Sequence, residues 1–112
     1  MRFATISSLI VQLKLPWPPT SNTYWRRNGN VYFISKKGRD YRDLVVKSAA
    51  AYREAFPKVC RLSLHVNAFP PDKRKRDLDN LFKSLLDSLQ HANIFEDDSQ
   101  IDELSIIRMP DY

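Results

Sequence analysis

The stretch from Lys73 to Lys83 joins a run of cations to two carboxylates. It consists of Lys73-Arg74-Lys75-Arg76, then Asp77 and Asp79, then Asn80 and Lys83. Carboxylate oxygens are hard ligands, and one or two of them, together with water and substrate phosphate, commonly hold Mg²⁺. Such an ion can generate hydroxide and stabilise the leaving oxygen when a phosphodiester is cleaved. The stretch is therefore a candidate site for metal-assisted phosphate chemistry, in which Lys83 contacts the scissile phosphate or orients the nucleophile.

The spacing of the two aspartates sets a condition on the local fold. A helix is predicted over residues 77–92, because apolar residues recur there at helical spacing. Residues two apart on a helix diverge by about 200°. Asp77 and Asp79 therefore approach one point only if Asp77 lies before the first turn. Asp79 and Lys83 then share the face opposite the apolar stripe.

These residues also have an ordinary structural interpretation. Asp77 is a good N-cap, and acids in a first turn complement the helix dipole. Asp79 and Lys83 have the spacing of a common surface ion pair. The residue pattern alone leaves both interpretations open.

A second acidic cluster, Glu96-Asp97-Asp98, precedes a strand predicted over residues 101–109. A solvated loop is the simplest interpretation of this cluster. If the last strand pairs near the strand that ends at Phe69, however, its N-terminal loop can meet the start of the 77–92 helix. The cluster would then supply a third carboxylate to the metal site.

The loop over residues 16–27 mixes tryptophans with cations, among them Arg26 and Arg27. Aromatic and cationic side chains together can stack on bases and hold phosphates. The alternative is a rigid, packed loop that covers the edge of a sheet.

Four strands and two helices are expected to position these residues. The strands are predicted over residues 9–15, 31–34, 59–69 and 101–109. One helix begins after its N-cap Ser35 and ends before Pro57, and the other is the 77–92 helix. The order ββαβαβ predicts a mixed α/β (α+β) domain, with a small mixed sheet of about four strands packed on two helices.

The composition predicts a small basic domain that binds a polyanion. The chain has 112 residues, a net charge of +5 and 43% hydrophobic residues, which is typical of one globular domain. One cysteine, Cys60, permits no internal disulfide and suits a reducing cytoplasm. No apolar run approaches the roughly 20 residues of a membrane span. Nucleic acid is the first expected partner.

The charge is unevenly distributed along the chain. Residues 1–71 carry twelve Lys or Arg and three acids, whereas residues 72–112 carry six Lys or Arg and ten acids. Carboxylates repel DNA, so an acidic third within a DNA-binding protein needs a reason. The acids are either solvated surface and helix-cap charges or ligands that hold divalent cations against phosphates.

At this point the sequence resembles the RusA family of Holliday junction resolvases. The resemblance covers roughly residues 9–110. It is carried by Leu15-Pro16-Trp17-Pro18-Pro19 with Asn22 and Tyr24, Gly38 with Tyr41-Arg42, Arg76-Asp77-Leu78-Asp79-Asn80-Leu81 with Lys83, and Phe95-Glu96-Asp97-Asp98-Ser99-Gln100-Ile101. The basic run followed by DLDN, the lysine and a downstream DD-x-Q is specific in combination.

The resemblance implies a homodimeric, Mg²⁺-dependent endonuclease that makes paired nicks in four-way DNA junctions during recombination and repair. It places the family's acidic triad on Asp77, Asp79 and Asp98 and its active-site lysine on Lys83. Asn80 and Asp97 are expected to support these residues. Arg76 matches a basic position that the family uses for DNA contact. From the charge pattern, DNA contacts are also expected from Lys73, Arg74, Lys75, Arg26 and Arg27.

The expected organisation is a single domain over residues 1–112. Relative to the family it has an N-terminal extension of about eight residues, and it ends where relatives continue into a further strand. A dimer also suits the substrate, because a two-fold pair of sites matches two symmetric cuts. The competing interpretations are a non-catalytic nucleic-acid-binding module, in which the aspartates are caps, and an inactive protein–protein adaptor.

Overall fold

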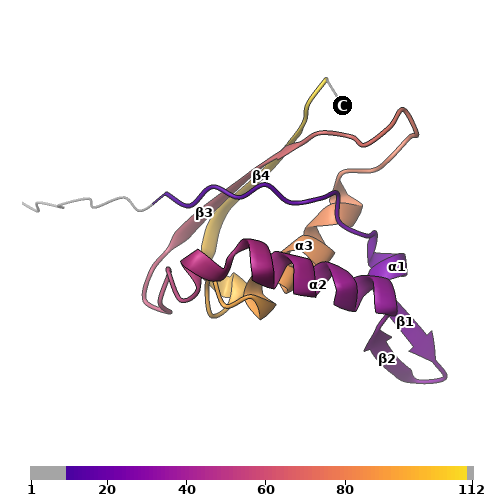
Figure 1. Cartoon of the computed structure of the whole chain (residues 1–112), viewed down its shortest axis with the longest axis horizontal. Coiled ribbons are helices and arrows are strands. Elements are labelled where there is room, and N and C mark those ends of the chain that lie inside the picture. Colours follow the sequence, from indigo (N-terminus) through magenta and orange to yellow (C-terminus); the bar gives the residue numbers. More distant parts are fainter. Residues whose placement is uncertain (1–9, 111–112) are drawn as a thin grey trace, which may run out of the picture.

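The computed structural model describes residues 10–110 and shows a mixed α/β fold (Figure 1). The mixed α/β class predicted from the sequence is confirmed. The elements are α1 (Ser21–Tyr24), β1 (Trp25–Asn28), β2 (Val31–Ile34), α2 (Lys36–Ser48), the 3₁₀ turn η1 (Ala50–Tyr52), β3 (Leu62–Ala68), α3 (Asp79–His91), the 3₁₀ turn η2 (Asp98–Gln100) and β4 (Ile101–Arg108). The N-terminal extension over residues 1–8 lies outside the described part of the chain.

The strands form two separate pairs, so the expected single sheet of about four strands is wrong. β1 and β2 form an antiparallel hairpin, and β3 pairs with β4 in parallel. The hairpin turns at Gly29, whose φ of 62° lies in the left-handed region that glycine adopts at little cost. A hairpin turn at this position follows from the Asn-Gly sequence.

The first expected strand, over residues 9–15, is also wrong where the structure describes it. Residues 10–15 lie outside any strand, although their burial alternates and Leu13 and Leu15 pack against the core. The burial alternates because one side of this extended segment packs against the core. Such packing does not require a hydrogen-bonded partner strand. After the four-residue helix α1, the strands and longer helices follow the order ββαβαβ, but the first strand is β1 at Trp25–Asn28 rather than a strand over residues 9–15.

Helix α2 begins where the sequence predicts. The Ser35 hydroxyl accepts a hydrogen bond from the Gly38 amide at 3.0 Å, which caps the first turn. Tyr41, Val45 and Ala49 are buried along one face. The helix ends at Ser48, earlier than the predicted end before Pro57, because η1 and an irregular segment follow it.

The core lies between α2, α3 and one face of the β3–β4 pair. Helix α3 contributes Leu85 and Leu89, and the segment after it contributes Ile94 and Phe95. Alternate residues of β3 (Leu62, Leu64 and Val66) pack against this cluster. The apolar faces defined by the helix and strand periodicities therefore pack together in one core.

A partly buried polar network joins the first three helices. The Tyr24 hydroxyl donates to the Asp87 carboxylate, and the Arg42 guanidinium donates to the same carboxylate at 2.6 Å. Burial, followed by the hydrogen bond to Asp87, raises the pKa of Tyr24. The network fixes α1, which leads directly into β1, against α2 and α3. Within residues 10–110 there is no helix both long and apolar enough to cross a membrane.

Candidate functional site

Helix α3 begins at Asp79, so Asp77 lies before the first turn, as convergence of the two carboxylates requires. The N-cap position is held by Leu78, which makes no side-chain cap bond. The alternative in which Asp77 caps the helix is therefore wrong. Asp77, Asp79 and Asn80 are all exposed.

The Asp79–Lys83 ion pair of the ordinary structural interpretation is not formed within residues 10–110. The Lys83 ammonium lies 5.2 Å from the centroid of the Trp25 ring, in the geometry of a cation–π contact. Within residues 10–110, no ion pair or side-chain hydrogen bond involves the carboxylate of Asp77 or Asp79. Both carboxylates are therefore open to an external ligand.

The basic loop before α3 is organised by Asp72, a residue that sequence reasoning did not single out. Its carboxylate binds the guanidinium of Arg76 at 2.5 Å and that of Arg74 at 3.1 Å. The hydrogen bond from Arg76, with further help from Arg74, holds the pKa of Asp72 well below its usual range. The Arg76 guanidinium also lies 5.6 Å from the Trp17 ring centroid. Two of the four predicted DNA-binding cations in this loop are thus held in place by the loop itself.

The remaining cations of the loop, Lys73 and Lys75, are exposed. The loop also gains a cation from the last strand, because the parallel register sets Arg108 opposite Ala68. The Arg108 guanidinium donates to the carbonyl of Arg76. A surface hollow of about 480 Å³ lies between this loop and the end of β4, and it is lined by Pro70, Asp72, Lys73, Arg74, Lys75, Arg76, Arg108, Met109 and Pro110. No sequence signal marks Arg108, since only strand pairing brings it here.

The second acidic cluster leads into the turn η2, with Asp97 as its N-cap, and is organised by the buried Gln100. The Gln100 side-chain oxygen accepts hydrogen bonds from the amides of Glu96 and Asp97 at 2.9 and 3.0 Å. Its side-chain NH₂ donates to the carbonyl of Pro57 at 3.0 Å. The Asp97 carboxylate accepts from the Ser99 hydroxyl at 2.5 Å, which lowers the pKa of Asp97. Asp98 is exposed.

Within one chain, the structure does not bring Asp98 to Asp77 and Asp79. The last strand does pair with β3, but in parallel, so its start lies beside Leu62 rather than beside the end of β3. The Asp98 amide donates to the Gln90 side chain, in the last turn of α3, at 3.3 Å. Gln90 lies about 16 Å along the helix from Asp79 at 1.5 Å per residue. In the part of the chain that the structure describes, no three acidic, His or Cys side chains gather as a metal site.

The positions of these clusters follow from the β3–α3–β4 connection. Asp77, Asp79 and the basic loop follow the carboxyl end of β3, and Asp98 precedes the amino end of β4. In parallel α/β units, ligands bind beyond the carboxyl ends of the strands. The carboxyl edge, with its exposed carboxylates and basic loop, is therefore the candidate functional site.

Arg26 and Arg27, the other predicted DNA contacts, lie on β1 and are exposed. The Arg27 guanidinium donates to the carbonyl of Gly29 at 2.6 Å and lies 5.4 Å from the Tyr32 ring centroid. Trp25, at the start of the same strand, contacts Lys83. The hairpin therefore begins beside the candidate site.

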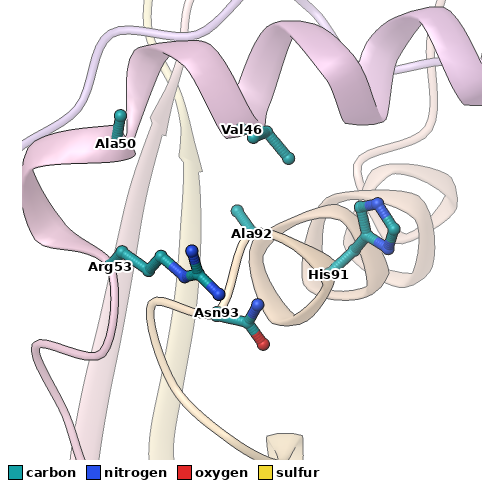
Figure 2. Close-up of a pocket in the computed structure, with 6 residues that line it drawn as sticks. All are labelled: Val46, Ala50, Arg53, His91, Ala92 and Asn93. Carbon is teal, nitrogen blue, oxygen red and sulfur yellow. The ribbon is translucent and has the colours of Figure 1, made fainter.

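A second hollow, of about 300 Å³, lies between the C-terminal ends of α2 and α3 (Figure 2). It is lined by Val46, Ala50, Arg53, His91, Ala92 and Asn93. None of the predicted site residues lines it, and α3 separates it from Asp79.

Comparison with known proteins identifies relatives along most of the chain. The family model described as endodeoxyribonuclease RusA matches residues 16–111. The chain is 48% identical over 97 residues to a crossover junction endodeoxyribonuclease rusA of Enterobacteria phage HK97, which covers 87% of this chain and 81% of the relative. It is 38% identical over 102 residues to the proteins of the same name from Enterobacteria phage 82 and from Escherichia coli strain K12, covering 88% of this chain and 82% of each relative.

Proposed function

The chain belongs to the endodeoxyribonuclease RusA family, and from this premise we propose that it resolves Holliday junctions by paired symmetric nicks during DNA recombination and repair. The observation that carries the proposal is the pair of exposed carboxylates, Asp77 and Asp79, beside the basic loop, for which residues 10–110 provide no side-chain partner. A structural role as a cap or an ion pair would have engaged these carboxylates. We propose that the enzyme acts in the cytoplasm, on DNA.

The donor set at the start of α3 fits Mg²⁺. Asp77 and Asp79 offer hard carboxylate oxygens, and their exposure leaves room for the waters and phosphate oxygens that Mg²⁺ retains. We propose that these two residues, with Asp98, hold the ion. When bound, the ion supplies Lewis acidity to the phosphate and lowers the pKa of a coordinated water.

The chain's own cations position the DNA around this site. Lys83 lies one turn after Asp79 and is kept away from that carboxylate by the Trp25 ring, so its charge stays available to the scissile phosphate. Asn80 can orient a phosphate or water through its amide. Lys73, Arg74, Lys75 and Arg76 contact the backbone, with the two arginines held in fixed directions by Asp72.

The distance along α3 from Asp79 to Asp98 favours a site completed by two chains. In a two-fold dimer, Asp98 of one chain approaches Asp77 and Asp79 of the other, and Asp97 supports it. Two such sites are related by the same axis that relates the two strands to be cut. A homodimer therefore supplies both the third carboxylate and the second cut.

The test is a nicking assay on a synthetic four-way junction, with Mg²⁺ and with EDTA. We expect Mg²⁺-dependent nicks at symmetric positions in opposite strands and no cleavage of linear duplex of the same sequence. Absence of cleavage of every branched substrate in Mg²⁺ would overturn the proposal.

The alternative is a non-catalytic basic nucleic-acid-binding module. One observation favours it: the described part of a single chain gathers no three-carboxylate metal site. This module would bind junctions with a strong salt dependence and cut none of them in any divalent metal.

A further inference from the structure

The β1–β2 hairpin carries exposed aromatic and apolar side chains that the proposed chemistry does not use. Figure 1 shows the hairpin extending away from α2 and α3. Val31, Tyr32 and Phe33 are 63%, 68% and 45% exposed. Three consecutive exposed side chains of this kind on a projecting hairpin are typical of a surface that binds a partner.

The register of the hairpin sorts these side chains onto two faces. Arg27 is opposite Tyr32, and Arg26 is opposite Phe33. Opposite residues share a face and neighbours alternate, so Trp25, Arg27 and Tyr32 lie on one face and Arg26 and Phe33 on the other.

The first face carries two cation–aromatic contacts, one of them at the candidate site. Lys83 contacts the Trp25 ring at 5.2 Å, and Arg27 contacts the Tyr32 ring at 5.4 Å. We name these four residues (Lys83, Trp25, Arg27 and Tyr32) the cation–aromatic row. Both cations contact rings, and neither forms an ion pair in the part of the chain that the structure describes, so their charge is not neutralised there.

The charge around the hairpin identifies the partner as a polyanion. Residues 25–39 contain five Lys or Arg and no acid, and the first acidic residue of the chain is Asp40. Asp40 is itself paired with Lys36 at 3.0 Å. Nucleic-acid bases stack on aromatic rings and on guanidinium planes, which the Arg27–Tyr32 pair offers together.

We propose that the cation–aromatic row receives an unstacked base at the branch point of the junction, stacked on the Arg27–Tyr32 pair. This inference rests on the proposed function, because it takes a branched DNA as the partner. In the unstacked form of a four-way junction, the base pair at the branch point lacks a stacked neighbour on one side, so a base leaves the helix there at lower cost than within a duplex. The row thereby connects the base to the strand that Lys83 contacts.

The test uses a four-way junction that carries 2-aminopurine at the branch point, bound in EDTA so that no cleavage occurs. Wild-type protein is expected to change the fluorescence, which reports stacking. Tyr32→Ala is expected to lose this change and to weaken junction binding about five-fold or more. Tyr32→Phe keeps the ring and is expected to behave like the wild type.

Phe33→Ala is the matched control, since it removes an exposed ring from the opposite face of the same hairpin. It is expected to keep the fluorescence change. An unaltered signal in Tyr32→Ala overturns the inference, as does an equal loss in Tyr32→Ala and Phe33→Ala. If Tyr32→Ala changes the sedimenting mass and leaves the fluorescence intact, the row binds a second copy of the chain, which also overturns it.

The same samples, assayed for nicks in Mg²⁺, separate this inference from the proposed function. If the wild type cleaves the junction and the fluorescence change does not depend on Tyr32, the nuclease function is supported and the stacking is rejected. A Tyr32-dependent signal without any cleavage supports the stacking and rejects the nuclease.

Discussion

Asp77 and Asp79 are available to a ligand because of where α3 begins. Helix α3 starts immediately after Leu78, which leaves Asp77 outside the helix. The Lys83 ammonium, which has the spacing to pair with Asp79, contacts the Trp25 ring instead. An ordinary helix start would have satisfied both carboxylates. Because neither carboxylate is engaged by a side chain of residues 10–110, we favour a role as metal ligands over a role as a helix cap or an ion pair.

Replacing a single proposed ligand is expected to separate cleavage from binding. Asp79→Asn and Asp98→Asn are each expected to reduce the nicking rate by about 100-fold or more, since even partners of metal ligands contribute 10–100-fold. Junction binding should persist or tighten, because a charge that repels phosphate is removed. Rates come from nicking in Mg²⁺ and affinities from gel shifts in EDTA. Wild-type nicking by both variants contradicts their assignment.

Lys83 is expected to act on the reacting phosphate rather than only on the DNA backbone. Lys83→Ala should lower the nicking rate by about 100-fold, the usual effect of removing one group that stabilises developing charge. Its effect on affinity should be small by comparison. Lys75→Ala is the matched control and should lower affinity and the salt slope of binding, with cleavage at saturating protein unchanged. Equal losses of binding and cleavage in Lys83→Ala would reduce Lys83 to a backbone contact.

At the scale of elements, the close contact between α2 and the turn before β1 depends on a glycine. A Cβ built on Gly38 would lie 2.6 Å from the Tyr24 carbonyl oxygen and 2.8 Å from the Ile34 side chain. Both neighbours belong to segments that lead into or out of the hairpin. The position of the hairpin on α2 is therefore set by the absence of a side chain at residue 38.

Gly38→Ala is expected to destabilise the protein, although alanine is the better helix former by about 1 kcal/mol. Overpacking against a backbone carbonyl typically costs about 1–3 kcal/mol and should outweigh that gain. Urea unfolding measures the difference. Lys37→Ala, at the exposed neighbouring position, should be nearly neutral or slightly stabilising. A stabilised Gly38→Ala would show that the contact is not as close as the structure has it.

The elements in which apolar residues recur at helix or strand spacing could be predicted from the sequence, whereas the pairing of the strands could not. Helix α3 was expected over residues 77–92 and is observed over Asp79–His91, because the apolar stripe dictates it. The strand expected over residues 101–109 is observed over Ile101–Arg108. The parallel direction of β3 and β4 depends on long-range packing, so the place of Asp98 at the far end of α3 left no local signal. The same applies to the contact between Trp25 and Lys83, which join different elements.

At the scale of the whole molecule, the proposed dimer can be tested by mixing two inactive variants. If each site takes Asp79 from one chain and Asp98 from the other, Asp79→Asn and Asp98→Asn chains assemble a dimer with one intact site. Mixing is then expected to restore nicking of one strand, after exchange of subunits. In a site built within one chain, both sites of the mixed dimer stay defective and no activity returns. Sedimentation at one chain mass would also contradict the dimer.

The stability of the protein is expected to fall in acid through three surface carboxylates. Arg76 lowers the pKa of Asp72, Ser99 lowers that of Asp97, and Arg61 lowers that of Asp102. Because these three pKa values are lower in the folded state, the ionised carboxylates stabilise the fold at pH values above their unfolded-state pKa of about 3.9. This stabilisation is lost as the pH falls through the folded-state pKa values. The melting temperature should therefore decrease between pH 5 and pH 3, modestly because the pairs are exposed. The melting temperature of Asp102→Asn should decrease less steeply with falling pH. A wild-type melting temperature that does not change with pH contradicts the expectation.

The parallel pairing of β3 and β4 also sets how far apart in the chain the contacting residues of this sheet lie. Each pair in this sheet joins residues about 40 positions apart, such as Leu64 and Leu104, so the chain must close a long loop before the first contact forms. Helix α3 lies inside that loop, so the entropic cost of closing the loop falls on the pairing of the strands and not on the local contacts of the helix. Asp79 and Lys83 lie one turn apart in α3, so their relative position does not depend on this closure. Arg108 reaches the basic loop only when the two strands pair.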